Sequence, residues 1–128
     1  SQNDAEKETN SIEVEEDVLD GQISGSALTP SVVRKMSRSF AGMSVTDAAI
    51  EELLLWYYEV VDEVGQNIRE HAQLGANPAT FIDAIDKMKD LMMLGWMRRM
   101  LVKAGEDAEE RGYKRIDVEQ LIHLDPFE

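Results

Sequence analysis

Two histidines, His71 and His123, have the most versatile side-chain chemistry in this chain. An imidazole can bind a metal ion or transfer a proton near neutral pH, and the chain offers 26 acidic residues as partners. Neither histidine belongs to a helical pair with metal-ligand spacing, and no cysteine is present to add a thiolate ligand. His71 also falls on the apolar stripe of an expected helix, which favours a structural or surface role. We expect no metal site and no cofactor.

The sequence lacks the common motifs of nucleophilic catalysis, nucleotide binding and metal-dependent catalysis. The chain contains no nucleophile elbow, no glycine-rich phosphate loop and no Glu-x-x-His pair. We therefore expect no catalytic residues and a protein that is not an enzyme. A weaker alternative stays open, in which His71 or His123 works with nearby acids in a metal-dependent or small-molecule enzyme.

Basic residues gather in three short segments. These are Arg34, Lys35 and Arg38; Arg98 and Arg99; and Lys114 and Arg115. Solvated helix faces and ion pairs within a helix account for most clusters of this kind. The first and third segments each lie by a short expected helix or the loop beside it. We treat the five residues of these two segments as the candidate phosphate-contacting set.

The segment MKDLMMLGWMRRM concentrates methionines around a tryptophan. Soft methionine side chains suit an adaptable protein-binding groove, but they also fill irregular cores. Core packing is favoured, and a partner-facing groove is the alternative. The candidate partner-binding residues are Met92, Met93, Trp96, Met97 and Met100.

Composition limits the class of protein. With 128 residues, of which 43% are hydrophobic and 30% charged, the chain suits one soluble domain. The formal net charge of −13 opposes contact with nucleic acid or acidic membranes unless cations gather on one face. The longest apolar run, near LLLWYY, is far shorter than the roughly 20 residues that cross a bilayer. We expect a cytoplasmic, unexported protein that does not contact membranes. A high-salt habitat is left open as a reason for the acidity.

Residues 1–26 differ in composition from the rest. They hold eight acids and one lysine, a charge of 1 − 8 = −7, and no aromatic residue. Such a segment cannot bury enough apolar surface to offset its ordering entropy. We predict a disordered acidic tail over 1–26 and a single helical domain over 27–128. A solvating role and a role as a segment that folds on binding both stay open for the tail.

Apolar residues recur at helical spacing after the tail. Thr29 can cap free backbone N–H groups and Pro30 suits the first helical position, which predicts a short helix from Pro30 to Phe40. A long amphipathic helix follows, with Ser44 and Asp47 resembling a capping box, and ends near Gly75. Its expected inward stripe is Ile50, Leu54, Tyr57, Val61, Val64, Ile68 and His71.

A second long helix should begin at Thr80, three residues before Asp83, and extend to about Ala104 or beyond Glu109. Its expected inward residues are Phe81, Ile85, Met88, Met92 and Trp96.

Gly112 should close the second long helix. Asp117 with Gln120 then caps a final short helix that Pro126 stops. No segment alternates as a half-buried strand does. The predicted fold is all-α, with helices in the order short, long, long, short.

Two segments resemble archaeal histones and their histone-fold relatives. LTPSVVRKMSRSFAGMSVTDAAIEEL is similar to their first helix, first loop and the start of the second helix, and GYKRIDVEQLIHL is similar to their second loop and third helix. The resemblance covers residues 28 to 72 and 110 to 124. The family's arginine after the loop glycine and its aspartate in the third helix are replaced by Tyr113 and Gln120, and residues 73–109 interrupt the pattern.

This resemblance implies a way of working. In the family, the second loop meets the first loop of a partner subunit, and together the loops present basic groups to DNA phosphates. A short-long-short set of helices has too little interior to cover its central helix, so it needs further apolar surface. The additional Met-rich helix could supply that surface within one chain or enlarge a dimer interface, and the sequence leaves both open.

The leading interpretation is a histone-fold-like, non-enzymatic protein that acts through protein association. We expect a homodimer or a helical protein partner, with weak and non-specific DNA contact left open. The alternative is an acidic helical-bundle adaptor or regulatory subunit without a role at nucleic acid.

Overall fold

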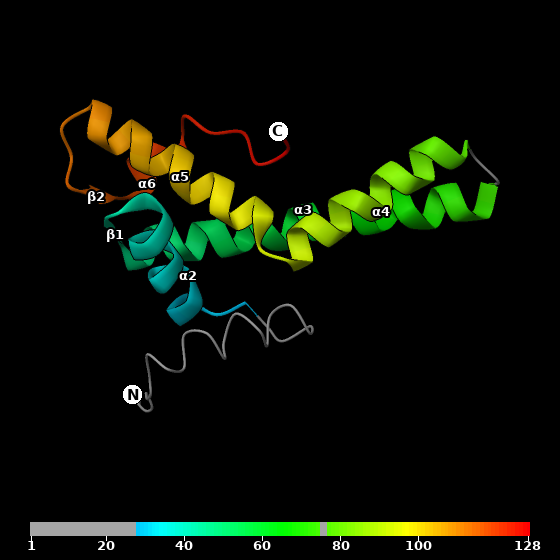
Figure 1. Ribbon diagram of the computed structural model, residues 1–128, viewed down its shortest axis with the longest axis horizontal. Helices are drawn as coiled ribbons and strands as arrows, with labels where there is room; N and C mark the ends of the chain where they lie inside the picture. Colours follow the sequence, from blue (N-terminus) through cyan, green and yellow to red (C-terminus); the bar gives the residue numbers. More distant parts are fainter. Residues whose placement is uncertain (1–27, 75–76) are drawn as a thin grey trace.

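Helices account for most of the computed structural model, which describes residues 28–74 and 77–128 (Figure 1). The predicted tail, residues 1–26, lies outside the described residues. The elements in chain order are α2 (Pro30–Met36), η2 (Ser37–Ala41), β1 (Ser44–Val45), α3 (Asp47–Leu74), α4 (Pro78–Met92), α5 (Gly95–Glu110), β2 (Arg115–Ile116) and α6 (Val118–Leu121). The described strands have only two residues each, so the all-α prediction is confirmed.

The first short helix starts as its sequence predicts. Thr29 Oγ1 accepts a hydrogen bond from Val32 N at 3.2 Å, and Pro30 occupies the first turn. The helix then widens into the π-helical turn η2, which ends at Gly42 in the left-handed conformation, with φ of 71°. Ser37 is fully buried there and donates a hydrogen bond to Met43 O at 2.7 Å. This bond ties η2 to the loop that leads into β1.

Two predicted helix starts are wrong. Ser44 lies in β1, and Thr46 caps α3 because its Oγ1 accepts from Ala49 N at 3.2 Å. Thr80 lies inside α4, which begins two residues earlier, after the Asn77 side chain accepts from Ala79 N at 2.8 Å. In both places two nearby residues have a side-chain oxygen that can cap a helix. The structure uses Thr46 rather than Ser44, and Asn77 rather than Thr80.

The second long helix is two helices. Between α4 and α5, Leu94 adopts the left-handed conformation with φ of 68°, which is uncommon for a residue with a branched side chain. Gly95 follows it, and a Cβ there would have to displace the Asp90 carboxylate. The turn allows Leu94 and Trp96 to be buried while Met92 stays 44% exposed. The prediction that Met92 points inward is therefore wrong.

The helices are arranged as a body and a hairpin. α3 runs the length of the molecule, with α2, β1, β2 and α6 around one end and α4 returning along the other end (Figure 1). We define the hairpin as residues 61–74 of α3 together with α4. The body comprises the other elements, including residues 47–60 of α3.

The core of the body is dense. α5 packs against η2, α2, α6 and β2, and its side chains Met97, Met100 and Leu101 have no exposed surface. Leu53 of α3 is equally buried. Along α3, the elements of the same chain that pack against it are α4, α2 and α6, and Tyr57 of α3 also contacts the ring of Trp96 in α5.

Candidate functional site

A pair of short parallel strands joins the loop that follows η2 to the loop that holds Lys114 and Arg115. Ser44 of β1 is the register partner of Arg115 in β2, and Val45 is the partner of Ile116. Thr46 N also donates to Ile116 O at 2.9 Å. Val45 and Ile116 face the core, while Arg115 is exposed. The first loop and the second loop therefore meet within one chain.

We call the surface around these loops the basic end. Its residues are Arg34, Lys35 and Arg38 from α2 and η2, and Lys114 and Arg115 from the β2 segment. Lys35 is half-buried and the other four are exposed. Figure 1 shows α2, β1 and β2 at the same end of the molecule, opposite the hairpin tip.

Charge is segregated along the fold. Residues 28–46 hold three cations and no acid, and residues 111–117 hold Arg111, Lys114 and Arg115 against Asp117, so the two segments total 3 + 2 = +5. α3 carries seven acids and Arg69, a total of 1 − 7 = −6. The cations and acids are therefore distributed unevenly along the chain, and two of the counted cations, Arg34 and Arg111, pair with acids outside these segments, Asp47 and Asp107.

Two of the acids beside the basic end, Asp47 and Asp117, have protein partners. Arg34 lies 3.4 Å from Asp47 Oδ1, but both side chains are exposed, so this pair contributes at most about 1 kcal/mol. Asp117 accepts from Val118 N and from Thr46 Oγ1, each at 2.8 Å. These bonds, with the nearby charge of Arg115, lower the pKa of Asp117 below its usual value despite partial burial. Asp117 therefore serves as the cap of α6.

The two residues of the second basic segment, Arg98 and Arg99, take different roles. Arg98 lies over the ring of Phe40 in η2, 4.6 Å from its centroid, and is exposed, so it extends the basic end along α5. Arg99 instead forms two hydrogen bonds to Asp90, at 2.7 and 3.0 Å. Sequence reasoning left Arg98 out of the candidate set. The sequence indicated that Arg98 and Arg99 would differ, because adjacent residues of a helix point about 100° apart and cannot both pair with the same carboxylate.

The Met-rich segment is divided between the core and the surface. Trp96, Met97 and Met100 are at most 2% exposed, so they cannot contact a partner in this fold. Met92 and Met93 are 44% and 59% exposed. They lie next to Leu91, whose carbonyl accepts a 3.4 Å hydrogen bond from Tyr57 Oη. We give the name knee to four exposed apolar residues near this contact in sequence, Leu55 and Tyr58 of α3 and Met92 and Met93 after Leu91.

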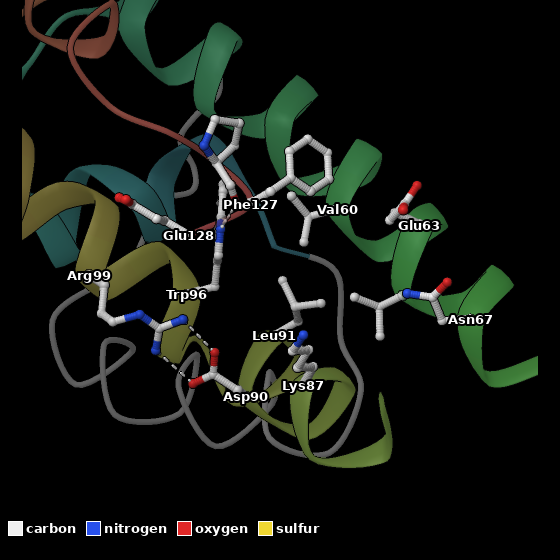
Figure 2. A pocket seen from close by; sticks show the side chains of 12 residues that line it. Val60, Glu63, Asn67, Lys87, Asp90, Leu91, Trp96, Arg99, Phe127 and Glu128 are labelled. Carbon is white, nitrogen blue, oxygen red and sulfur yellow. Dashed lines mark hydrogen bonds and ion pairs between the residues drawn. The ribbon is translucent and has the colours of Figure 1, made fainter. Parts of the chain in front are cut away.

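A cavity of about 390 Å³ opens where α3, α4, α5 and the C-terminal segment converge (Figure 2). Val60, Leu91 and Trp96 form its apolar part. Trp96 Nε1 donates to Pro126 O at 2.7 Å, which holds the C-terminal segment against α5.

The charged groups at this cavity pair mainly with protein partners. The hydrogen bond to Asp90 raises the pKa of Arg99, although partial burial opposes the shift. Lys87 lies 3.4 Å from Asp83, and Glu128 lies 3.7 Å from Lys103. These contacts make the cavity a structural junction between the hairpin and the body.

The two histidines lie far apart in the fold. His71 is half-buried near the end of α3. His123 Nδ1 lies 3.2 Å from Asp107, which also accepts from Arg111 at 3.0 Å. Burial raises the pKa of Asp107, but the bonds from Arg111 and His123 outweigh it, so the pKa falls below its usual value. Among residues 28–74 and 77–128, no group of three or more His, Cys, Asp or Glu side chains could hold a metal ion.

Within the described part of the chain, no helix is both long and apolar enough to span a membrane. Comparison of the chain with protein-family models, with curated proteins and with solved structures gave no match. The residues and their geometry alone therefore carry the functional argument.

Proposed function

We propose that this chain is a non-enzymatic, histone-fold-like association protein, and that its basic end binds the phosphate backbone of duplex nucleic acid weakly and without sequence preference. The observation that carries the proposal is the parallel pairing of β1 with β2. This pairing joins residues 28–46, which carry +3, to residues 111–117, which carry +2. The two segments are separated by 111 − 46 = 65 positions in the sequence.

The chemistry of the basic end suits phosphates rather than base edges. Arg34, Arg38, Lys114 and Arg115 are exposed cations on a short helix and a loop, and Arg98 lies on the neighbouring α5. Each cation that neutralises a phosphate releases a counterion, so binding should weaken steeply with salt. Phosphate contacts carry no sequence information, because every nucleotide has the same backbone.

The total charge of the chain opposes this binding. The described residues and the tail together sum to −13, and α3 alone contributes −6. At physiological salt, however, charges farther apart than about 8 Å are largely screened from each other. The local cations therefore dominate at contact, and the global charge keeps the affinity in the range of non-specific complexes, about 10⁻⁴ to 10⁻⁶ M.

The test is fluorescence anisotropy with a labelled 30-base-pair duplex in a salt series from 20 to 200 mM. Lys114→Glu with Arg115→Glu should reduce affinity at least about tenfold and make the logarithmic salt slope less negative by about 1.8, which is 0.9 for each lost phosphate contact. A second duplex of shuffled sequence should bind equally well.

A matched control separates local from global charge. Lys87→Glu with Lys89→Glu changes the net charge by the same amount, but on α4, in the hairpin. It should change affinity about twofold or less. If the wild type ignores duplex at 20 mM salt, or if both double variants bind alike, the phosphate-binding proposal fails.

Exposed apolar residues favour a second candidate function, self-association through the knee. Leu55, Tyr58 and Met93 are each more than half exposed, and Met92, the last residue of α4, is 44% exposed. A second copy of the chain would cover this surface, which agrees with the predicted homodimer. Light scattering from micromolar to millimolar concentration tests it. Met93→Asp with Leu55→Asp should make the protein monomeric, and a wild type that is already monomeric at millimolar concentration would exclude this role.

A further inference from the structure

The basic end has a possible occupant within the same chain. Residues 1–26 carry −7, with five of their eight acids between Glu13 and Asp20. This charge is opposite in sign to the +5 of residues 28–46 and 111–117. An anionic peptide presents carboxylates where a nucleic acid presents phosphates, so both can engage the same arginines and lysines.

The rest of the described surface disfavours an acidic segment. α3 carries −6, and residues 78–110 carry five cations against seven acids, a total of −2. Three of these five cations are paired with protein carboxylates: Lys87 with Asp83, Arg99 with Asp90, and Lys103 with Glu128. Arg98 is exposed, but it lies over Phe40 and so belongs to the edge of the basic end. Charge complementarity therefore points to one surface.

The attachment point is also favourable. Leu28 is 5% exposed and belongs to the core cluster immediately before α2. It anchors the start of the described chain six residues before Arg34. A segment attached this close acts at an effective concentration on the order of millimolar. It can thus compete with a weak external ligand.

We propose that the acidic residues 13–20 dock on the basic end of their own chain and compete there with nucleic-acid phosphates. The competition rests on the proposed phosphate binding, whereas the docking does not. Because both ligands are polyanions, salt weakens docking and phosphate binding together. The negative charge of residues 13–20 then determines the fraction of molecules whose basic end is free to bind an external polyanion.

The docking is tested without nucleic acid in the full chain. No native cysteine interferes, so Ser11→Cys can carry a single nitroxide spin label. At 20 mM salt the label should broaden the amide NMR signals of residues 38–42 and 113–116, but not those of α4. The broadening should vanish at 500 mM salt. It should also vanish when Glu13, Glu15 and Glu16 become Gln and Asp17 becomes Asn. Absence of broadening, or equal broadening in α4, overturns the docking.

The competition is tested by anisotropy with the same duplex as above. The tail-neutralised full chain should bind about tenfold more tightly than wild type at 50 mM salt. The control neutralises four exposed acids of α3, Glu51, Glu59, Asp62 and Glu70, and so changes net charge equally. This control should gain at most about twofold.

The outcomes separate the two proposals. If no variant binds duplex but the spin label broadens the basic end, phosphate binding fails and intramolecular docking stands. If all variants bind duplex with equal affinity and no broadening occurs, phosphate binding stands and the tail inference fails. Equal gains from tail and α3 neutralisation would also overturn the competition, since global charge would then explain both.

Discussion

The body and the hairpin are built from similar amphipathic helices, but they cover their apolar stripes to different extents. In the body, Met97, Met100, Leu101 and Leu53 are completely buried by several elements. In the hairpin, α4 packs mainly on α3, and only Val64, Ala84 and Leu91 are buried among the described side chains of that region. Ile85 and Met88 are half-buried.

This difference shows what a third packing partner adds. Two antiparallel helices cover only the sides that face each other, so the flanks of each apolar stripe remain in contact with water. α5 is flanked by η2, α2, α6 and β2 and is covered on several sides. Stability should therefore be concentrated in the body, and the body also holds the basic end. The hairpin should be the region that opens first.

The largest difference should come from paired methionine truncations. Met97→Ala in the body should lower the free energy of unfolding by about 2–5 kcal/mol, because it removes buried surface and leaves a cavity. Met93→Ala at the knee, with the same chemical change, should alter it by no more than about 0.5 kcal/mol. Urea denaturation followed by circular dichroism measures both. Equal effects would mean that the knee is covered in solution.

Two helical glycines should respond in opposite directions to alanine. A Cβ on Gly105 would lie 3.0 Å from Ala41 Cβ, so Gly105→Ala should force α5 away from η2 and cost about 1–3 kcal/mol. A Cβ on Gly65 in the hairpin meets nothing closer than 3.7 Å, so Gly65→Ala should stabilise the fold by about 0.5–1 kcal/mol. Thermal unfolding midpoints give both signs. A stabilising Gly105→Ala would show that the contact between α5 and η2 is loose.

Ile85→Ala should weaken the hairpin without affecting the body. Loss of a half-buried side chain from α4, which packs mainly on α3, should speed hydrogen exchange of α4 amides by about tenfold, the equivalent of about 1.4 kcal/mol of local opening energy. Amides of α5 should exchange at the wild-type rate. A parallel loss of protection in α5 would mean that hairpin and body unfold as one unit, which contradicts the comparison.

The smallest expected effect concerns acid stability in the body. The folded-state pKa values of Asp107 and Asp117 lie below the ordinary value of 3.8, so their carboxylates stabilise the fold above that pH. The contribution is lost as the pH falls through the lowered values. Asp107→Asn with Asp117→Asn should therefore flatten the acid side of the thermal midpoint profile.

A control places the same changes on the exposed face of α3. Glu59→Gln with Asp62→Asn should leave the acid side of that profile as steep as in the wild type, because both side chains are exposed. Equal flattening in the two double variants would assign the acid sensitivity to net charge rather than to the bonds of Asp107 and Asp117.

Local chemistry explains which features could be predicted from the sequence. The Thr29 cap, the Asp117 and Gln120 capping box and the end of α3 near Gly75 depend on a few adjacent residues, and the structure confirms them. The exact start of α3 could not be predicted from the sequence, because Ser44 and Thr46 are both good N-cap residues. The predicted inward stripe of α3 is partly wrong, because Leu53 and Val60 are more deeply buried than the predicted Leu54 and Val61.

The sequence by itself determined the helical class, the short first and last helices and the separation of acidic and basic segments, because periodicity and charge are properties of neighbouring residues. Only the tertiary structure decided that the methionines of α5 are core and that Met92 and Met93 are surface, since this depends on the left-handed turn at Leu94. It also decided that β1 pairs with β2 of the same chain. That contact joins residues about 70 positions apart, and its formation depends on the return path of α4 and α5, which no local pattern encodes.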